Sequence, residues 1–390
     1  MNTEEIMKRD AENVMGTYAR YDLCLEKGNG ATCYSPEGKK YIDFSSGIGV
    51  NSLGFCDKGW VEAITKQANM IQHISNLFYT YPCSKLAEMV LKRTSMQKMF
   101  FANSGAEANE GAIKTARKYS FQKYGENRYE IITLVNSFHG RTMATITATG
   151  QEDYHKYFAP FVKGFSYAKA NDIDDVKSKI NEKTCAIMLE LVQGEGGVVP
   201  LEKDFVSNIS KICKEKDIIF IVDEVQTGIG RTGTLFAYEQ FSIEPDLVTL
   251  AKGLGAGLPI GGILFGKKTC DVLKPGDHGT TFGGNPITCA GGIEVLKRID
   301  DAFLKEVSEK GAYIKDAVEK MDNVVSVTGM GMMLGIEVKN KTAKDVVKTC
   351  IENGLIPLTA KEKIRLLPPL TITYEELDEG LEILKKALSN

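Results

Sequence analysis

Short apolar runs rich in β-branched residues recur along the chain. They are FFA (100–102), IITLV (131–135), AIML (186–189), IIFIV (218–222), LVTL (247–250) and GGILF (261–265). Runs of this length and composition predict buried strands. Between them lie segments with the apolar spacing of a helix, among them WVEAITKQANMIQ, SKLAEMVLKRT, EANEGAIKTARKY and FVSNISKICKEK. This alternation is typical of an α/β fold with a mostly parallel sheet.

The pattern changes at KPGDHG, a turn-rich segment that indicates a domain boundary near residue 275. Beyond it, longer helical segments (287–298, 302–321, 343–353, 374–388) surround a few strands (332–338, 363–367). We therefore expect a large domain over residues 45–275 and a smaller α+β domain. The smaller domain would combine the N-terminal segment 1–44 with residues 276–390.

Composition excludes several classes of partner. The chain has 390 residues, 43% hydrophobic and 25% charged, with a formal net charge of -3 and no run of Lys or Arg. Nucleic acid is therefore not an expected partner. The N-terminus is polar and acidic, and no apolar stretch has the length of a membrane span, so we expect a cytoplasmic protein without a membrane partner. Nine cysteines are scattered singly without a C-x-x-C pair, which indicates reduced thiols and no metal site.

The candidate chemistry lies directly after the predicted strands. IIFIV is followed by Asp223, LVTL by Ala251 and Lys252, and AIML by Glu190. In an open parallel sheet, ligands bind at the carboxyl ends of the strands, so these side chains would share one edge. An acid and a lysine together suit pyridoxal phosphate (PLP), whose ring nitrogen needs an anion and whose aldehyde needs an amine. From these residues alone, a structural ion pair is an equally good interpretation.

Two further segments carry candidate binding residues. Ser104, Gly105 and Ala106 lie between a predicted strand and a helix, where free backbone N–H groups could hold a phosphate. The same Ser104-x-x-Glu pattern is also an ordinary capping box. In NSFHGRT, Phe138 could stack on a planar ring and Arg141 could bind a carboxylate. The neighbouring histidine, His139, is expected to have a supporting role.

These residues belong to a longer series of motifs in a fixed order. The series is NSGAEANE, FHGRT, VQGEGG, VDEVQTGIGRTG, LAKGLGAGLPIGG, HGTTFGGNP and IRLLPPL. Together they closely resemble the class III aminotransferases, which have the fold type I of PLP-dependent transferases shared with aspartate aminotransferase. The resemblance runs from about residue 17 to the C-terminal helix. It implies that the large domain binds PLP.

The resemblance also implies roles for individual residues. Lys252 would bond to PLP as a Schiff base, and Asp223 would pair with the pyridine nitrogen. Val225 and Phe138 would cover the two faces of the ring, and Gln226 would reach its hydroxyl. The phosphate would lie against Ser104, Gly105 and Ala106. Thr281 resembles the residue that reaches the phosphate of the neighbouring subunit's cofactor, which implies a homodimer with shared active sites.

Substrate-binding residues are implied in the same way. Arg141 resembles the arginine that receives the α-carboxylate of ornithine-type donors. Glu195 and Arg365 resemble a pair that is closed in the first half-reaction and opens in the second, when Arg365 binds the side-chain carboxylate of 2-oxoglutarate. From the residues alone, this pair could equally be an ordinary buried salt bridge. Ile48 occupies the position at which ornithine aminotransferases have a tyrosine.

The chain is most similar to the acetylornithine branch of the family. That branch moves the terminal amino group of N2-acetyl-L-ornithine to 2-oxoglutarate, giving N-acetylglutamate 5-semialdehyde and L-glutamate, in arginine biosynthesis. Succinylornithine, ornithine and GABA remain alternative donors. A noncatalytic PLP-binding regulator and an aminomutase are less favoured, because no room remains for a DNA-binding module and because Glu195 and Arg365 indicate an external acceptor.

Overall fold

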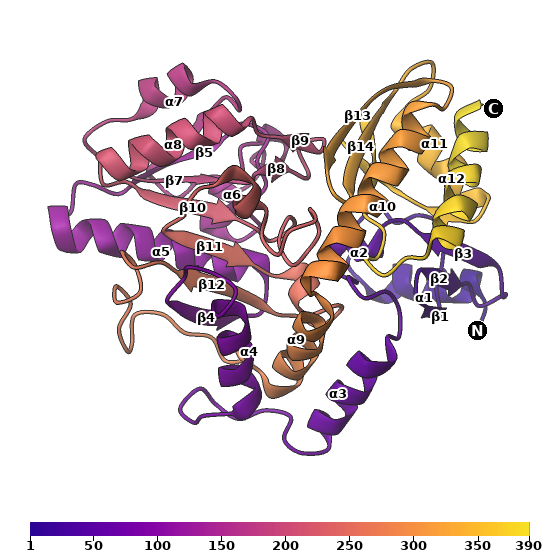
Figure 1. Ribbon diagram of the computed structural model, residues 1–390, viewed down its shortest axis with the longest axis horizontal. Coiled ribbons are helices and arrows are strands. Elements are labelled where there is room, and N and C mark those ends of the chain that lie inside the picture. The colour runs from indigo at the N-terminus through magenta and orange to yellow at the C-terminus, as the bar shows by residue number, and fades with distance from the viewer. Residues whose placement is uncertain (390) are drawn as a thin grey trace.

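The computed structural model describes residues 1–389 and has two lobes (Figure 1). The larger lobe is built on a seven-stranded sheet with the order β4-β12-β11-β10-β7-β5-β6. Its strands are β4 (Lys98–Ala102), β12 (Gly261–Phe265), β11 (Leu247–Leu250), β10 (Ile219–Asp223), β7 (Thr184–Leu189), β5 (Glu130–Leu134) and β6 (Phe165–Ala168). The six apolar runs all form strands, as predicted, whereas β6 was not anticipated.

Alternate residues of the sheet pack into two separate cores. On β7, Ile187 and Leu189 face the core that contains α8 (Lys203–Glu215), whereas Ala186 and Met188 face the core that contains α5 (Gly105–Tyr124). Helices therefore cover both faces of the sheet, and all six residues of β7 are buried. This is why the strands are continuous apolar runs rather than alternating ones.

The sheet is mostly parallel, as the sequence predicts. The pairs β10–β11, β10–β7, β5–β7 and β5–β6 are parallel. Only β12 runs against its neighbours, pairing antiparallel with both β11 and β4. The carboxyl ends of the other strands therefore share one edge of the sheet.

The smaller lobe contains two four-stranded sheets. One is formed by β13 (Val324–Met330), β14 (Met333–Val338), β17 (Lys363–Leu366) and β16 (Leu358–Ala360). The other joins β1 (Lys27–Asn29), β2 (Thr32–Tyr34) and β3 (Lys40–Asp43) to β15 (Leu355–Ile356), which pairs parallel with β3. The two ends of the chain therefore fold together.

The C-terminal helices lie close to their predicted ranges. They are α9 (Pro286–Arg298), α10 (Asp301–Glu319), α11 (Ala343–Glu352) and α12 (Tyr374–Ser389). Although α9 follows the expected boundary at residue 275, its Cys289 and Val295 pack in the core of the larger lobe. The division into domains remains a prediction.

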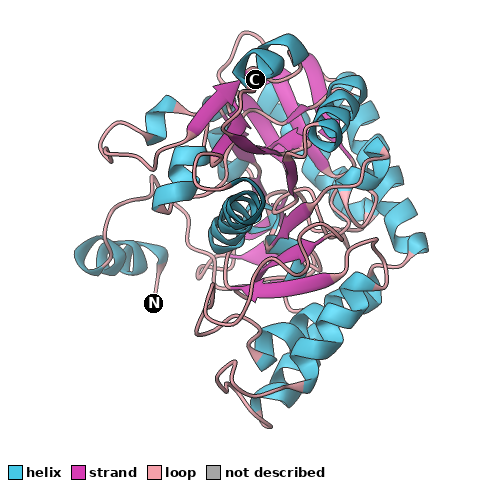
Figure 2. Ribbon diagram, turned by 90° about the vertical axis from the view of Figure 1, so that its left-hand side faces the viewer, coloured by secondary structure: helices cyan, strands magenta, loops and turns pink. Residues whose placement is uncertain are grey.

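The remaining elements are short or peripheral. The helices are α1 (Thr3–Asn13), α2 (Ser46–Gly49), α3 (Lys58–Ala68), α4 (Tyr81–Leu91), α6 (Met143–Ala148) and α7 (Ile173–Lys179), and a two-stranded ribbon joins β8 (Val192–Gln193) to β9 (Val199–Pro200). Single 3-10 turns are η1 (Glu152–Tyr154), η2 (Ala237–Phe241) and η3 (Lys252–Leu254). Helix α1 buries no residue and stands apart from the body (Figure 2). Over residues 1–389, no helix is both long and apolar enough to cross a membrane.

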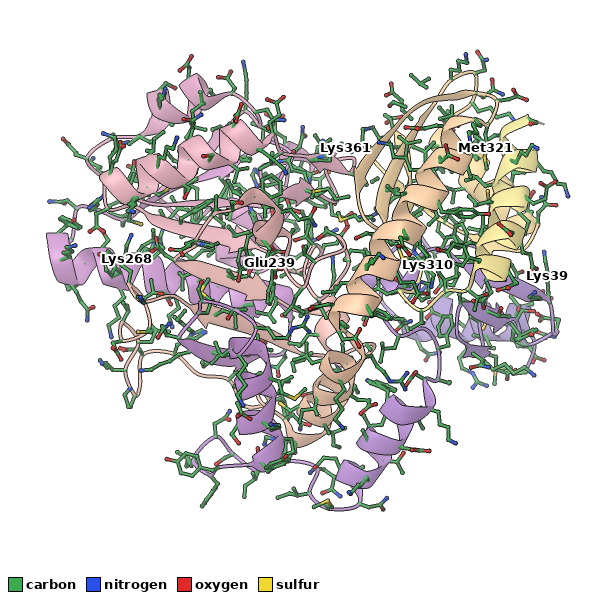
Figure 3. The ribbon with its side chains drawn as sticks, viewed as in Figure 1. Lys39, Glu239, Lys268, Lys310, Met321 and Lys361 are labelled. Atoms are coloured by element: carbon green, nitrogen blue, oxygen red, sulfur yellow. The ribbon has the colours of Figure 1, made fainter. Side chains whose placement is uncertain are left out.

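Two cationic side chains connect the lobes. Arg231 is buried and donates hydrogen bonds to the carbonyl oxygens of Met332 (3.1 Å) and Pro368 (2.6 Å). Burial lowers the pKa of Arg231 to about 9, against the opposing effect of the Asp43 charge. Lys361 lies between the lobes in Figure 3 and donates to the side-chain oxygen of Asn136. These contacts hold the β16–β17 hairpin beside the carboxyl edge of the large sheet.

Candidate active site

A cavity of about 470 Å³ opens at the carboxyl edge of the seven-stranded sheet. The loops after five different strands contribute to its wall, which includes Ser104, Phe138, Arg141, Glu190, Asp223 and Lys252. The prediction that these strand-end side chains lie together is therefore confirmed. Such convergence of polar groups from several loops is typical of ligand sites in α/β sheets.

Lys252 follows β11 and lines this cavity. Its backbone has a φ of +41°, a left-handed conformation that residues other than glycine seldom adopt. Burial lowers the pKa of Lys252 to about 8, although the nearby Glu195 carboxylate acts in the opposite direction. A larger share of this amine is therefore neutral, and hence nucleophilic, near physiological pH than for an exposed lysine.

Asp223, the last residue of β10, is held by a network of buried hydrogen-bonding partners. Its Oδ2 accepts a hydrogen bond from the Asn109 amide and lies within 2.8 Å of His139 Nδ1, while Oδ1 accepts from the Val225 N–H. Asp223 is 3% exposed, so these partners replace water around its carboxylate. His139 thus has the supporting place expected of it.

The N-terminus of α5 forms another part of the wall. Ser104 Oγ accepts a hydrogen bond from the N–H of Glu107, so Ser104 is the N-cap of α5. The Glu107 carboxylate accepts from the N–H of Asn103 rather than from that of Ser104, so the second bond of a capping box is not formed. Gly105 lies so close to Val225 that a Cβ there would be 2.6 Å from Val225 Cγ1. The glycine allows the helix terminus, with its free N–H groups, to reach the cavity.

The loop after β5 brings Phe138 and Arg141 to the cavity wall. The backbone N–H of Phe138 donates to Glu190 Oε2 at 2.9 Å, which ties this loop to the end of β7. Burial raises the pKa of Glu190 to about 7, a shift that the His139 charge opposes. Arg141 is exposed, and its guanidinium carbon lies 4.4 Å from the centre of the Tyr154 ring and 5.9 Å from that of Phe138.

Glu195 and Arg365 form a closed, two-pronged ion pair beside Gln226. Arg365 Nη1 lies 2.6 Å from Glu195 Oε1, Nη2 lies 3.3 Å from Oε2, and Nη1 also reaches Gln226 Oε1 at 3.4 Å. Burial alone would raise the pKa of Glu195, but the charge and hydrogen bonds of Arg365 outweigh it and lower that pKa. Glu195 and Arg365, which the resemblance to the family suggested as a pair, therefore form an ion pair within one chain.

Four predicted site residues do not line the cavity: Glu195 and Arg365 adjoin it through Gln226, whereas Ile48 and Thr281 lie elsewhere. Ile48 is 41% exposed and has a φ of +64°, and its neighbour Val50, rather than Ile48 itself, contributes to the cavity wall. Thr281 is exposed and lines a separate cavity of about 330 Å³ with Asn103 and His278. The roles of Ile48 and Thr281 remain predictions.

Comparison with known proteins places the chain in a family. The aminotransferase class-III family matches residues 16–388. The chain belongs to the class III aminotransferases. It is 49% identical over 391 residues to the acetylornithine aminotransferase of Haemophilus ducreyi, covering 100% of both chains. It is also 50% identical to that of Caldanaerobacter subterraneus, over 96% of this chain and 97% of the relative.

The chain also has the same fold as solved structures of aminotransferases. The ornithine aminotransferase of Toxoplasma gondii, which has partial occupancy of PLP at its active site, superposes with a TM-score of 0.95 at 29% identity over 100% of this chain and 94% of the other. The N-acetylornithine aminotransferase of Stenotrophomonas maltophilia superposes with a TM-score of 0.83 at 34% identity, covering 95% of this chain and 97% of the other. The predicted fold, a mostly parallel α/β transaminase fold, is confirmed.

Sequence reasoning missed one residue of the cavity wall, Asn109, and one that contacts the wall, Tyr154. Asn109 donates to Asp223 from the buried face of α5, where a polar residue beside Ala108 and Ala112 was an available signal. Tyr154 contacts Arg141 and Phe138 from η1, a segment without a clear periodic pattern. The contacts of Tyr154 with Arg141 and Phe138 are therefore visible only in the tertiary structure.

Proposed function

We propose that this class III aminotransferase uses PLP to transfer the terminal amino group of N2-acetyl-L-ornithine to 2-oxoglutarate. The products are N-acetylglutamate 5-semialdehyde and L-glutamate, as in arginine biosynthesis. The main observation in support is that Lys252, with its lowered pKa, and the buried Asp223 line the same cavity. The choice of donor is supported by two acetylornithine aminotransferases that match nearly the whole chain at 49% and 50% identity.

The cavity wall fits PLP in three respects. The α5 terminus offers backbone N–H groups to a phosphate, and Gly105 removes the side chain that would obstruct this approach. Asp223 offers a buried carboxylate to a ring nitrogen. Lys252 offers an amine to an aldehyde. PLP, when bound, supplies an aldehyde that captures amines and a ring that withdraws electrons from the neighbouring carbon.

The protein's own residues would then position groups and move a proton. Lys252 Nζ would take a proton from the carbon that bears the donor's terminal amine and hold it within the cavity, a role that its lowered pKa favours. Asp223 would remain the anionic partner of the ring, held by Asn109 and His139. Phe138 and Val225 would enclose the ring between them.

Two cationic groups would bind the substrates in turn. Arg141 would bind the carboxylate of the donor at the cavity mouth, while Arg365 stays paired with Glu195. When 2-oxoglutarate enters, its carboxylate would replace Glu195 as the partner of Arg365. Because Arg365 is 3% exposed, releasing it without a new anion would leave a buried unpaired charge. The pair therefore favours dicarboxylic acceptors.

Ornithine is the second candidate donor, because the Toxoplasma ornithine aminotransferase superposes so closely. Ile48, however, cannot offer a hydrogen bond to the free amine of an ornithine head group, and sequence identity to that enzyme is only 29%. Acetylornithine, whose α-amine is acylated, does not need such a bond. We therefore rank it first.

We further propose that the enzyme is a cytoplasmic homodimer. Thr281 is exposed and does not line the Lys252 cavity of its own chain, and the separate cavity that it lines shares Asn103 with the Lys252 cavity. This position suits a residue that completes the phosphate site of a second subunit. The proposal rests on the resemblance to the family and on the exposed position of Thr281.

A spectral titration tests the donor. The purified PLP form is mixed with N-acetylornithine, succinylornithine, ornithine or GABA, and conversion to the pyridoxamine phosphate form is followed by absorbance. We expect fastest conversion with N-acetylornithine and reversal by 2-oxoglutarate. Preference for another donor would overturn the choice of substrate, whereas near-normal turnover by a Lys252→Ala variant would overturn the assignment of Lys252.

A further inference from the structure

Arg141 is the one predicted substrate-binding cation without a polar partner. Within residues 1–389, neither a carboxylate nor a carbonyl oxygen lies within hydrogen-bonding or ion-pair distance of its guanidinium, whereas Arg365 has Glu195 and Gln226. An arginine side chain has many rotamers, so a free one must be ordered when a carboxylate binds. Something else must hold Arg141 at the cavity mouth if it is to bind efficiently.

The Tyr154 ring is in the position to do so. The guanidinium carbon of Arg141 lies over this ring at 4.4 Å from its centre, well within the range of a cation–π contact. Tyr154 also meets Phe138 edge to face, with 5.6 Å between ring centres and an interplanar angle of 67°. Phe138 and Arg141 both line the cavity, whereas Tyr154 contacts both side chains without lining it.

The backbone that carries Tyr154 is itself anchored on both sides. Gln151 donates from its side-chain amide to the carbonyl oxygen of Ser137 at 3.1 Å, next to Phe138. His155 Nε2 lies 2.8 Å from the carbonyl oxygen of Ile146, and its ring packs on Phe161 with 4.9 Å between centres. The segment that carries Tyr154 is therefore held against the loop after β5 and against α6, and the Tyr154 ring itself packs on Phe138.

Stacking on this ring is compatible with carboxylate binding. A guanidinium that lies over an aromatic ring engages its flat face, while its N–H donors point outward in the plane and can form a fork with a carboxylate. We infer that Tyr154 is a positioning residue that pre-orders Arg141 for the carboxylate of the amino donor, and that it thereby favours donors carrying that carboxylate. The inference deepens the proposed function and rests on the role given there to Arg141.

The experiment compares two donors that differ only in the carboxylate. They are N-acetylornithine and N-acetyl-1,4-diaminobutane, which has the same acetamide and terminal amine but no carboxylate. Half-reactions are measured by stopped-flow absorbance with the wild-type PLP enzyme and with Tyr154→Leu, Tyr154→Phe and Arg141→Leu. The ratio of kcat/KM for the two donors is taken within each variant, so a partial loss of folded or loaded enzyme cancels.

With Tyr154→Leu, the half-saturating concentration of N-acetylornithine should rise about fivefold, or about 1 kcal/mol, while the saturating rate stays within about twofold. Reaction with the carboxylate-free donor should change by less than about twofold. Tyr154→Phe keeps the ring and should behave as wild type in both reactions. Arg141→Leu should lower the ratio further than Tyr154→Leu does.

Three outcomes would overturn the inference. Equal losses with both donors in Tyr154→Leu would mean that the ring serves the fold or the cofactor rather than Arg141. A loss in Tyr154→Phe as large as in Tyr154→Leu would assign the effect to the hydroxyl group. If Arg141→Leu itself does not distinguish the donors, the role proposed for Arg141 fails, and the inference about Tyr154 fails with it.

Discussion

At the scale of single residues, burial is the main influence on the titrating groups of the cavity. It raises the pKa of Glu190 to about 7 and lowers that of Lys252 to about 8, because a low-dielectric environment disfavours either charge. Glu195 departs from this trend, since the charge and hydrogen bonds of Arg365 outweigh burial. The site thus combines groups that titrate near neutrality with a carboxylate, Glu195, whose pKa is lowered by its arginine partner.

The lowered pKa of Lys252 can be measured without cofactor or substrate. Only the neutral amine reacts with trinitrobenzenesulfonate, so labelling of Lys252 in the cofactor-free protein should rise with pH and reach half its maximum near pH 8. Lys98 is the control, because its hydrogen bond and charge contact with Asp271 raise its pKa above the ordinary value. Peptide mass spectrometry at each pH reports both residues. Coincident profiles for Lys252 and Lys98 would contradict the shift.

At the scale of secondary-structure elements, the site depends on how closely α5 approaches the loop after β10. Gly105 is the first residue of the helix, and Val225 lies two residues beyond the end of β10. Because Gly105 has no side chain, the backbone of the helix packs directly against the Val225 side chain. The helix terminus and Asp223 can therefore face one ligand.

Gly105→Ala tests this close approach. The new methyl group would stand 2.6 Å from Val225 Cγ1, so helix or loop must shift, and we expect a loss of about 1–3 kcal/mol in unfolding free energy. Affinity for PLP should fall as well, because Val225 would be displaced from the ring. Gly16→Ala is the control, since no atom lies within 4 Å of its added Cβ. Urea denaturation and PLP titration give the two readouts; equal behaviour of both variants would refute the argument.

At the scale of the whole molecule, the chain leaves an apolar surface beside Thr281. The side chains of Leu77, Phe78, Tyr81 and Phe282 are exposed, and Leu77 is 87% exposed. Asn76 donates hydrogen bonds to the carbonyl oxygens of Thr280 and Gly283, at 3.0 Å each, which joins the two segments into one surface. Contiguous apolar surface of this kind indicates a site of protein association.

If this surface is the proposed dimer interface, Leu77→Asp should weaken association, because a charge would be buried against apolar side chains. The wild-type protein should sediment as a dimer at micromolar concentration, and the variant should dissociate at concentrations at least about tenfold higher than the wild type. Val325→Asp is the control, a similarly apolar and 54% exposed position on β13 of the smaller lobe. A monomeric wild type, or an unchanged Leu77→Asp dimer, would contradict the assignment.

The sequence by itself determined six of the seven strands of the large sheet and most of the cavity wall. Each buried strand is a continuous apolar run because helices cover both faces of the sheet, and that pattern is visible without coordinates. The rule that parallel strands present their carboxyl ends at one edge was then enough to bring Asp223 and Lys252 together.

Only the tertiary structure decided what depends on contacts between distant segments. Three examples are the pairing of β15 with β3, the hydrogen bond from Arg231 to Pro368 and the contact of Arg141 with the Tyr154 ring. No periodic pattern in the sequence predicts any of these contacts. Roles that need a second subunit, such as that of Thr281, remain predictions. Local patterns record which face of an element is buried, whereas the partner that covers that face is chosen by the packing of the whole chain.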